Sequence, residues 1–379
     1  MTEAAKVDAA LFDAWADDPK SAVALHLRQE LLPVEGKGAV FFPPTYAQED
    51  RKKSKSPYTI DTLSDGTKVA MIDSVGSQAN RMEPMFRKAK SGQPENHLAK
   101  LAPQIEIDIG NDRTVSLFDA GHRLGDAIVR ASGLAQVAKE AFAAYRERGD
   151  ASPIAKLAPT TLVFGAWDSR GEGAKLPRLV SAAIRAWDVD ELTRSAQYTP
   201  PIDYAKLEVF SEEDKKAAES NAKNPLAQRG YVAVPSVGSH GGIVARGPIA
   251  RDVTVNLVAL RQLDGENGGK LRRYVLALAL LAGNDPQDGF LRQGCLLTTD
   301  PDSRTRWMSV ARTGVRTLLE IDPAVLLSYA EDAARAFGVG EDRRIKFDAA
   351  LAKKDLTDGD AKKGKKGKGK PDSEEAAAE

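Results

Sequence analysis

A short polar segment, IDSVGSQANR, combines hydroxyl, amide and guanidinium groups where an apolar strand would turn into a helix. Its polar members are Ser74, Ser77, Gln78, Asn80 and Arg81. Small polar side chains at a helix start lie beside free backbone N–H groups, and with an arginine they suit phosphate binding without catalysis. Simple N-capping by Ser74 or Ser77 would explain one serine, but not the whole cluster that Arg81 follows.

A second segment, FGAWDSRGEGAKLPR, places an aromatic ring among basic residues on a glycine-rich loop. Trp167 is followed by Arg170, Lys175 and Arg178. A ring that stacks on a base, with cations that meet the phosphates, is typical of proteins that bind single-stranded nucleic acid. Two other interpretations stay open: an ordinary turn with Trp167 packed on the core, and metal-assisted cleavage that uses Asp168.

A third segment, FDAGHRLGD, carries Asp119, His122 and Asp126 at helical spacings. A catalytic interpretation would make His122 a base that a carboxylate orients. The alternative is a helix N-terminus whose aspartate faces the positive end of the helix dipole and whose histidine makes a structural hydrogen bond. We favour the alternative, because no nucleophile or metal-ligand set accompanies these residues.

The composition narrows the function classes. The 379 residues include 54 Lys plus Arg and 54 Asp plus Glu, so the formal net charge is zero and a polyanion must be bound by a local basic patch. The single cysteine, Cys295, excludes an intramolecular disulfide and a CxxC metal site, and we expect it to be buried in packing. No phosphate loop, GxGxxG dinucleotide motif or GxSxG elbow occurs. The sequence predicts no cofactor and no metal.

The sequence also gives no sign of a membrane protein or an exported one. The longest apolar run, residues 275–282, is far shorter than the roughly 20 residues that span a bilayer. The acidic N-terminus lacks the basic and apolar regions of a signal peptide. We therefore expect a cytoplasmic protein that does not enter a membrane.

Hydrophobic periodicity predicts strands and helices that do not strictly alternate, which favours an α+β fold over a doubly wound sheet. The expected strands are residues 39–42, 68–72, 104–109, 161–164, 230–234, 253–257 and 291–297. The expected helices are residues 21–32, 78–90, 117–130, 135–148, 176–187, 271–282 and 323–337.

Three parts of the chain are expected from the changes in composition. Residues 1–35 form an acidic N-terminal segment with one helix. Residues 36–345 form one core with insertions near 43–57, 199–225 and 235–247. Residues 346–379 form a Lys/Gly-rich tail, which we expect to be disordered because it cannot bury enough apolar surface to offset the entropy of ordering.

Five phrases of the sequence together resemble the RAMP backbone subunit of type I-G (formerly I-U) CRISPR Cascade complexes. They are IDSVGSQANRMEPMF, SLFDAGHRLGDAIVR, APTTLVFGAWDSRGEGAKLPRLV, LTRSAQY and LRRYVLALALLA, and the resemblance covers residues 25 to 340. It implies an RRM-like (ferredoxin-like) core with large finger- and thumb-type insertions. It also implies a noncatalytic subunit that stacks head to tail along a CRISPR guide RNA.

The resemblance also implies partners and contacts. The partners are the guide RNA, target DNA through the guide, further copies of the chain, and other Cascade subunits. Ser77, Gln78 and Arg81 match a polar helix start that lies against the guide backbone in such subunits, so they would contact guide phosphates or riboses. Local chemistry and the family phrases add Asn80, His122, Arg123, Arg170, Lys175 and Arg178, with Trp167 as the stacking residue.

Two other functions remain as alternatives. A metal-dependent RNA-cleaving backbone subunit of the type III kind would use Asp168 and a divalent metal. A metabolic α/β enzyme, the less favoured of the two, would use Asp119 and His122 and would need a deep pocket around them.

Overall fold

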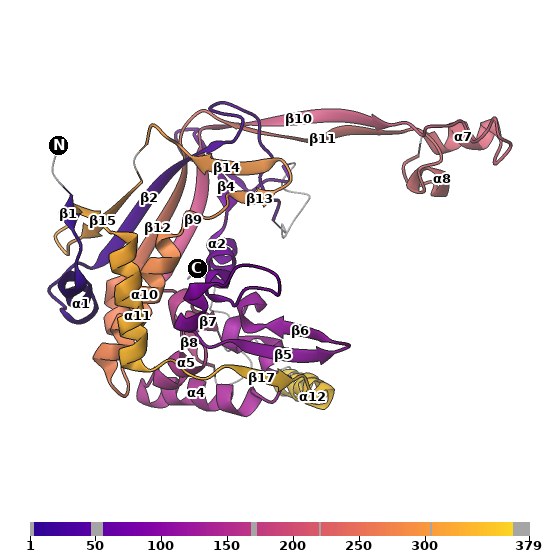
Figure 1. Ribbon diagram of the computed structural model, residues 1–379. Helices are drawn as coiled ribbons and strands as arrows, with labels where there is room; N and C mark the ends of the chain where they lie inside the picture. Colours follow the sequence, from indigo (N-terminus) through magenta and orange to yellow (C-terminus); the bar gives the residue numbers. More distant parts are fainter. Residues whose placement is uncertain (1–3, 47–55, 168–172, 220, 304, 367–379) are drawn as a thin grey trace.

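A ten-stranded sheet forms the centre of the molecule in the computed structural model, which describes residues 4–46, 56–167, 173–219, 221–303 and 305–366 (Figure 1). Its middle strands, all antiparallel and in this order, are β15 (Arg306–Val310), β2 (Ala24–Pro33), β12 (Ile249–Asn256), β9 (Val180–Trp187) and β4 (Lys68–Asp73). The outer strands are β1 (Ala5–Lys6), β3 (Ile60–Thr62), β13 (Phe290–Arg292), β14 (Cys295–Thr299) and β16 (Arg316–Glu320).

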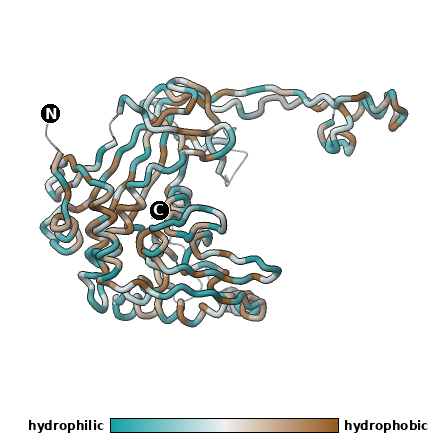
Figure 2. Tube along the Cα trace, viewed as in Figure 1, coloured by the Kyte–Doolittle hydropathy of each residue, from teal (hydrophilic) through white to brown (hydrophobic). Residues whose placement is uncertain are grey.

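One face of this sheet is covered by helices. Along β2 every second residue is buried, beginning with Leu25 and Leu27, as expected for a strand with one face on the core. The covering helices are α1 (Ala9–Asp17), α10 (Gly268–Asn284) and α11 (Pro323–Phe337). Figure 2 shows hydrophobic residues gathered along α10, which packs on β12 and β9 and is covered by α11. α10 is buried almost all round because other helices pack on its far side.

A second layer continues from α10 away from the sheet. It contains α4 (Ala135–Arg148), α5 (Ser152–Leu157) and α6 (Thr160–Phe164), and α5 and α6 pack against α10. A three-stranded sheet stands beside these helices and consists of β17 (Arg343–Lys346), β5 (Ile105–Gly110) and β6 (Arg113–Ser116). α12 (Ala349–Lys366) follows β17.

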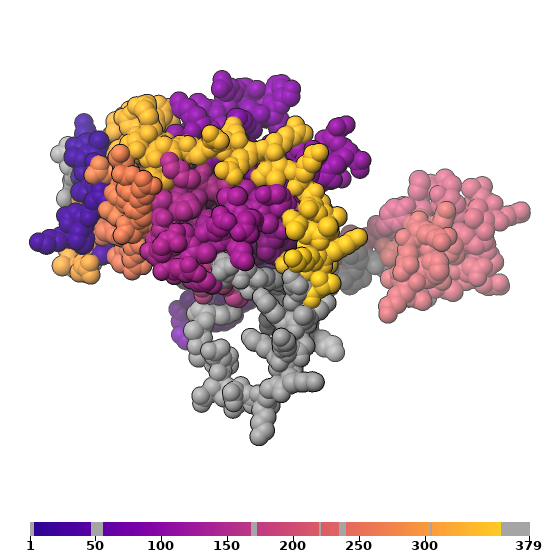
Figure 3. Space-filling view, turned by 90° about the horizontal axis from the view of Figure 1, so that it is seen from below, coloured from indigo at the N-terminus to yellow at the C-terminus, as the bar shows by residue number. Residues whose placement is uncertain are grey.

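A long two-stranded arm projects from the main sheet (Figure 1). β10 (Val189–Tyr198) continues the chain from β9, and β11 (Val234–Ala245) returns to β12. Beyond Val189 the whole of β10 is exposed, and the tip stands apart from the body (Figure 3). The tip holds α7 (Glu212–Glu219) and α8 (Pro225–Gln228) on a small apolar cluster of its own. Among the described residues, the arm contacts the body along its root half, where Arg194 lies over the Phe42 ring and Ile243 bridges to Phe41.

α2 (Val75–Met82) begins directly after β4 and packs on the covered side of the sheet against β9. In Figure 1 the arm and the β5–β6 hairpin project to the same side, with α2 between them. The remaining short elements are η1 (Glu83–Phe86), η2 (His97–Leu101), η3 (Leu117–Asp119), η4 (Arg123–Gly125), α3 (Ala127–Arg130), α9 (Leu257–Arg261), β7 (Ala166–Trp167) and β8 (Lys175–Leu176).

The predicted α+β class is confirmed, and several elements lie where the sequence predicted them. The helices predicted at 135–148 and 323–337 coincide with α4 and α11. The predictions at 68–72, 104–109, 253–257, 271–282 and 291–297 correspond to β4, β5, the end of β12, α10 and the β13–β14 hairpin. Residues 78–90 begin within α2 and continue as η1.

Four predicted elements are wrong in type. Residues 21–32, predicted as a helix, form β2, and the helix predicted at 176–187 is mostly β9. The strand predicted at 161–164 is part of α6, and residues 230–233 of the strand predicted at 230–234 precede β11 as a turn. A short apolar run does not by its periodicity separate a buried strand from a buried helix. Sheet pairing made strands of the two segments predicted as helices.

Four other segments differ from the prediction in continuity, in pairing or in order. The helix predicted at 117–130 is broken into η3, η4 and α3, with Asp126 capping α3 through the Ile128 N–H. At 39–42 only Phe41 pairs, in a bridge to Ile243. Residues 235–247, expected as a loop insertion, fall mostly in β11. α12 occupies residues 349–366, where composition predicted no order, and residues 367–379 lie outside the described chain.

Every helix in the described ranges is too short or too polar to span a lipid bilayer.

Candidate nucleic-acid interface

Ser74 starts α2 by capping it. Its Oγ accepts the Ser77 N–H at 3.3 Å, so the predicted capping role belongs to Ser74. The Ser74 N–H itself donates to the Tyr46 hydroxyl at 2.9 Å. Ser77 is partly exposed in the first turn of the helix. Protein groups thus satisfy the helix start, and Ser77 is left partly exposed.

Asp73, the last residue of β4, organises the polar side chains of α2. It is fully buried, and its Oδ2 accepts Gln78 Nε2 at 2.7 Å and Arg81 Nε at 3.0 Å. The Arg81 guanidinium also donates to the carbonyl oxygens of Phe290 at 3.3 Å and Leu291 at 3.1 Å. The Arg81 side chain remains 35% exposed, so one edge of it is available to a ligand.

Gln78 does not reach the surface, which corrects the expectation that it contacts RNA. It is completely buried, and its Oε1 accepts Arg251 Nε from β12 at 3.0 Å. Burial lowers the pKa of Arg251 to about 10, against the opposing influence of Asp285 and Asp73. Gln78 therefore links α2 to the sheet and holds Asp73 in position to orient Arg81.

Arg123 was also expected to contact RNA, and that prediction is wrong because its side chain lies inside the protein. Its side chain is 4% exposed, and its Nε lies 2.7 Å from Oε2 of Glu83, which is also buried. Its guanidinium lies 5.2 Å from the centre of the Phe164 ring. Burial raises the pKa of Glu83 to about 7 against the opposing attraction of Arg123, and burial lowers the pKa of Arg123. This ion pair is a structural centre, and a ligand cannot reach it.

Arg123 ties three segments of the chain to one another. Its Nη1 donates to the Gly165 carbonyl at 3.2 Å, before β7, and its Nη2 donates to Asn80 Oδ1 at 3.4 Å, on α2. His122 comes directly before it in the chain. The backbone of Arg123 is left-handed, with φ 52°, so the turn at η4 directs this side chain inward while His122 is exposed.

Several predicted residues are exposed around this centre. Trp167 on β7 is 62% exposed and pairs across the two-stranded β7–β8 sheet with exposed Lys175. The Arg178 stem passes so close to Gly165 that a Cβ there would meet Arg178 Cγ at 2.8 Å. The exposed members of this surface, hereafter the Trp167 face, are Asn80, His122, Trp167, Lys175 and Arg178. The structure therefore joins the two segments that the sequence singled out.

Two predicted residues, Asp168 and Arg170, lie outside the described residues. The aspartates around His122 do not form a catalytic set with its ring. Asp119 pairs with Arg87 at 2.7 Å, and Asp126 accepts the backbone N–H of His122 at 3.2 Å.

Metal-ligating groups and the single cysteine were the remaining candidates for chemistry in the described part of the chain. It holds no group of three or more metal-ligating side chains. Cys295 is buried, as predicted, and burial raises the pKa of its thiol to about 12, so it remains protonated at neutral pH.

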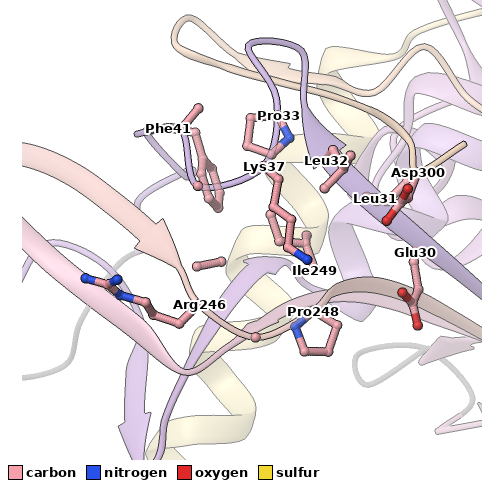
Figure 4. Close-up of a pocket in the computed structure, with 14 residues that line it drawn as sticks. Glu30, Leu31, Leu32, Pro33, Lys37, Phe41, Arg246, Pro248, Ile249 and Asp300 are labelled. Atoms are coloured by element: carbon pink, nitrogen blue, oxygen red, sulfur yellow. The ribbon is translucent and has the colours of Figure 1, made fainter. Parts of the chain in front are cut away.

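Two cavities flank these elements. One, of about 380 Å³, lies beside Asn80 and Arg81 and is closed on its other side by residues 285–291. The other, also about 380 Å³, lies at the arm root, with Arg246 on one side and Glu30 and Asp300 on the other (Figure 4). Arg246 pairs with Asp190 there. Only the first cavity adjoins the helix that carries the predicted RNA contacts.

Glu83 and Arg251 are the structural residues that sequence reasoning missed. Glu83 is the one charge in the apolar stretch MEPMF, Arg251 lies beside Asp252 in the otherwise uncharged stretch PIARDVTV, and both Glu83 and Arg251 are buried. A charge in such a stretch signals a buried pair or network, although nothing in the sequence identifies its partner.

A comparison with family models adds to this geometry. Residues 25–191 match the model described as CRISPR-associated protein GSU0053. Over this segment, which is less than half of the chain, the protein is similar to a CRISPR-associated family. The matched segment runs from β2 into β10 and contains the Trp167 face, the Glu83–Arg123 pair and α2. No curated protein matches the chain.

Proposed function

We propose that this protein is CRISPR-associated and is a noncatalytic guide-RNA-binding subunit that forms the backbone of a type I Cascade complex. The observation that carries the proposal is the Trp167 face. It places one exposed ring next to Lys175 and Arg178 on a support that the buried Arg123 fixes. A ring for stacking with cations for phosphates is what a sequence-independent contact with single-stranded RNA requires.

The strand order supports an RRM-like core. β15, β2, β12 and β9 are adjacent and antiparallel. Helices occupy the β2-to-β9 and β12-to-β15 connections, and β9 joins β12 through the arm. Strand–helix–strand–strand–helix–strand is the order of ferredoxin-like folds. In this proposal the arm is the thumb-type insertion, placed in the hairpin of that core.

The shape of the arm supports assembly with further copies. Every residue of β10 beyond Val189 is exposed, and the tip exposes Ile202, Leu207 and Val209. A head-to-tail contact joins different surfaces of neighbouring copies and does not close, so the guide RNA would set the length of the assembly. The same arrangement would leave base edges free for target DNA, because the contacts go to phosphate and sugar.

The first experiment is purification from cells that carry a CRISPR array, followed by sequencing of the bound nucleic acid. Guide RNA is the expected result, and the RNA should remain intact. Protein that emerges without RNA would contradict the proposal. Mg²⁺-dependent cleavage at regular spacing that Asp168→Ala abolishes would favour the RNA-cleaving alternative instead.

Charge reversal tests the Trp167 face directly. Lys175→Glu and Arg178→Glu should weaken RNA binding equally for all sequences, and each should lower the slope of log K against log salt by about 1. Arg335→Glu is the matched control, because Arg335 is an exposed arginine on α11. Fluorescence anisotropy over a salt series measures both quantities. A loss confined to some sequences would show that the face reads bases.

A further inference from the structure

The candidate interface depends on α3, a helix of only four residues. η4 lies directly before α3 in the chain, separated from it by Asp126, and η4 packs against β7, the strand that carries Trp167. A single helical turn is not stable by itself, because fixing the first turn costs more free energy than its hydrogen bonds return. The position of the Trp167 face therefore depends on the contacts that fix α3 at its two ends.

Asp126 fixes the first end of α3. Its Oδ1 accepts the Ile128 N–H at 3.1 Å, which caps the helix, and its Oδ2 accepts the His122 N–H at 3.2 Å. One carboxylate thus ties α3 to the turn in which His122 is exposed and Arg123 is buried. A displacement of α3 would therefore move both of these residues.

The C-terminal segment of the chain fixes the other end of α3. The Asp348 N–H donates at 2.8 Å to the carbonyl oxygen of Ala131, the residue after α3, and Phe347 forms a β-bridge with Ser132. Asp348 also caps α12, because its Oδ1 accepts the Ala350 N–H at 2.8 Å. The chain thus passes from β17 into α12 against the end of α3, and α12 packs on α3.

Arg130, the last residue of α3, joins α12 to η4. Its Nη1 donates at 2.8 Å to the carbonyl oxygen of Gly125, the last residue of η4. Its Nε donates at 3.3 Å to Oδ2 of Asp355 on α12. The side chains of Arg130 and Asp355 are only 21% and 34% exposed, so this ion pair is partly shielded from salt. Asp355 thus holds one edge of the guanidinium while another edge is bonded to η4.

We propose that Asp355 and Arg130 are positioning residues for RNA binding, through which α12 holds α3 and η4 in the arrangement that presents His122 and Trp167 to the RNA. The inference rests on the proposed function. It adds a C-terminal element to the interface, because α12 lies beyond residues 25–191, the segment that matches the family model. Coupling between two sites is reciprocal, so bound RNA should in turn stabilise the docked α12.

The affinity for a guide-length single-stranded RNA, measured by fluorescence anisotropy with the full-length protein, tests the inference. Asp355→Ala should weaken binding about two- to fivefold, the value of one partly exposed ion pair. Arg130→Met also removes the hydrogen bond to η4, so it should weaken binding about tenfold. Asp355→Glu keeps a carboxylate within reach of Arg130 and should restore the wild-type affinity.

Two further measurements separate positioning from a general loss of stability. The ring signal of His122 in the NMR spectrum of the free protein, assigned by its loss in His122→Gln, should shift in Asp355→Ala. The signals of the other three histidines should stay in place. Bound RNA should slow the hydrogen exchange of residues 349–357 in the wild type and have no such effect in Asp355→Ala, because that substitution breaks the link between α12 and the interface.

Asp332→Ala is the matched control, because Asp332 pairs with Arg335 on α11, and it should change neither the affinity nor the His122 signal. An Asp355→Ala variant that behaves like this control would overturn the inference and leave the proposed function standing. Weaker RNA binding with an unmoved His122 signal would overturn the inference as well, since α12 would then act on the RNA by another route. A wild-type protein that does not bind RNA would overturn the proposed function, and the inference with it.

Discussion

Arg123→Met should show how strongly the buried ion pair holds the interface together. The substitution leaves Glu83 without its partner and removes the hydrogen bonds to Gly165 and Asn80. Removing one member of a buried pair costs about 3–5 kcal/mol, because the remaining charge loses its compensation. We therefore expect the free energy of unfolding at pH 8 to fall by about that amount.

The free energy of unfolding should depend on pH in the wild type, and more steeply in Arg123→Met. Burial raises the pKa of Glu83 from 4.5 to about 7, so the folded protein binds this proton more tightly than the unfolded chain does. The stability that it contributes is present in full below pH 4.5 and is lost as the pH rises through about 7. One pKa unit corresponds to about 1.36 kcal/mol, so the titration of Glu83 should lower the wild type's free energy of unfolding by about 3 kcal/mol between pH 4 and pH 8. Arg123→Met should steepen the loss, because Arg123 opposes the rise in pKa.

Urea unfolding followed by circular dichroism at pH 5, 6.5 and 8 measures these differences. Adding Glu83→Gln to Arg123→Met removes the titrating group, so the double variant should lose the extra pH dependence and be more stable than Arg123→Met at pH 8. Arg178→Met, an exposed change nearby, should stay within about 0.5 kcal/mol of the wild type. Equal pH profiles for Arg123→Met and the wild type would refute the reasoning.

Three further predictions concern the Trp167 face and the arm. Trp167→Ala should weaken RNA binding by about 1–3 kcal/mol in anisotropy with an unchanged melting temperature, because the ring is exposed; unchanged affinity would show that it does not stack. Gly242→Ala should cost about 1–3 kcal/mol in urea unfolding, since φ is +88° and a Cβ would lie 2.7 Å from the Phe41 carbonyl oxygen. A variant as stable as the wild type would mean that the arm root adjusts. Replacing residues 199–233 with Asn-Gly should leave the melting temperature of the body unchanged, because the tip has its own apolar cluster. The same replacement should abolish RNA-dependent assembly in size-exclusion chromatography. Assembly that persists would exclude the tip from the contact between copies.

The sequence singled out the segments of the candidate interface but not which of their polar side chains are buried. Residue type and spacing singled out Asn80, Trp167 and Lys175, which are exposed, and Ser74, which caps α2. Gln78 and Arg123 looked equivalent to their neighbours, yet they are buried. A polar side chain on a short helix or turn faces inward or outward according to what packs above it, and local spacing does not contain that information.

By itself the sequence determined the α+β class of the fold, the long amphipathic helices α4 and α11, and the two polar segments that carry the candidate interface. These are local properties, since helical periodicity, capping and charge depend on neighbours along the chain. Only the tertiary structure decided that residues 24–33 and 180–187 are strands, that Glu83 pairs with Arg123, and that Gln78 meets Arg251 from 173 positions away. Strand pairing and buried ion pairs are formed by residues distant in sequence, so their energies appear only when the sheet and its helices are assembled.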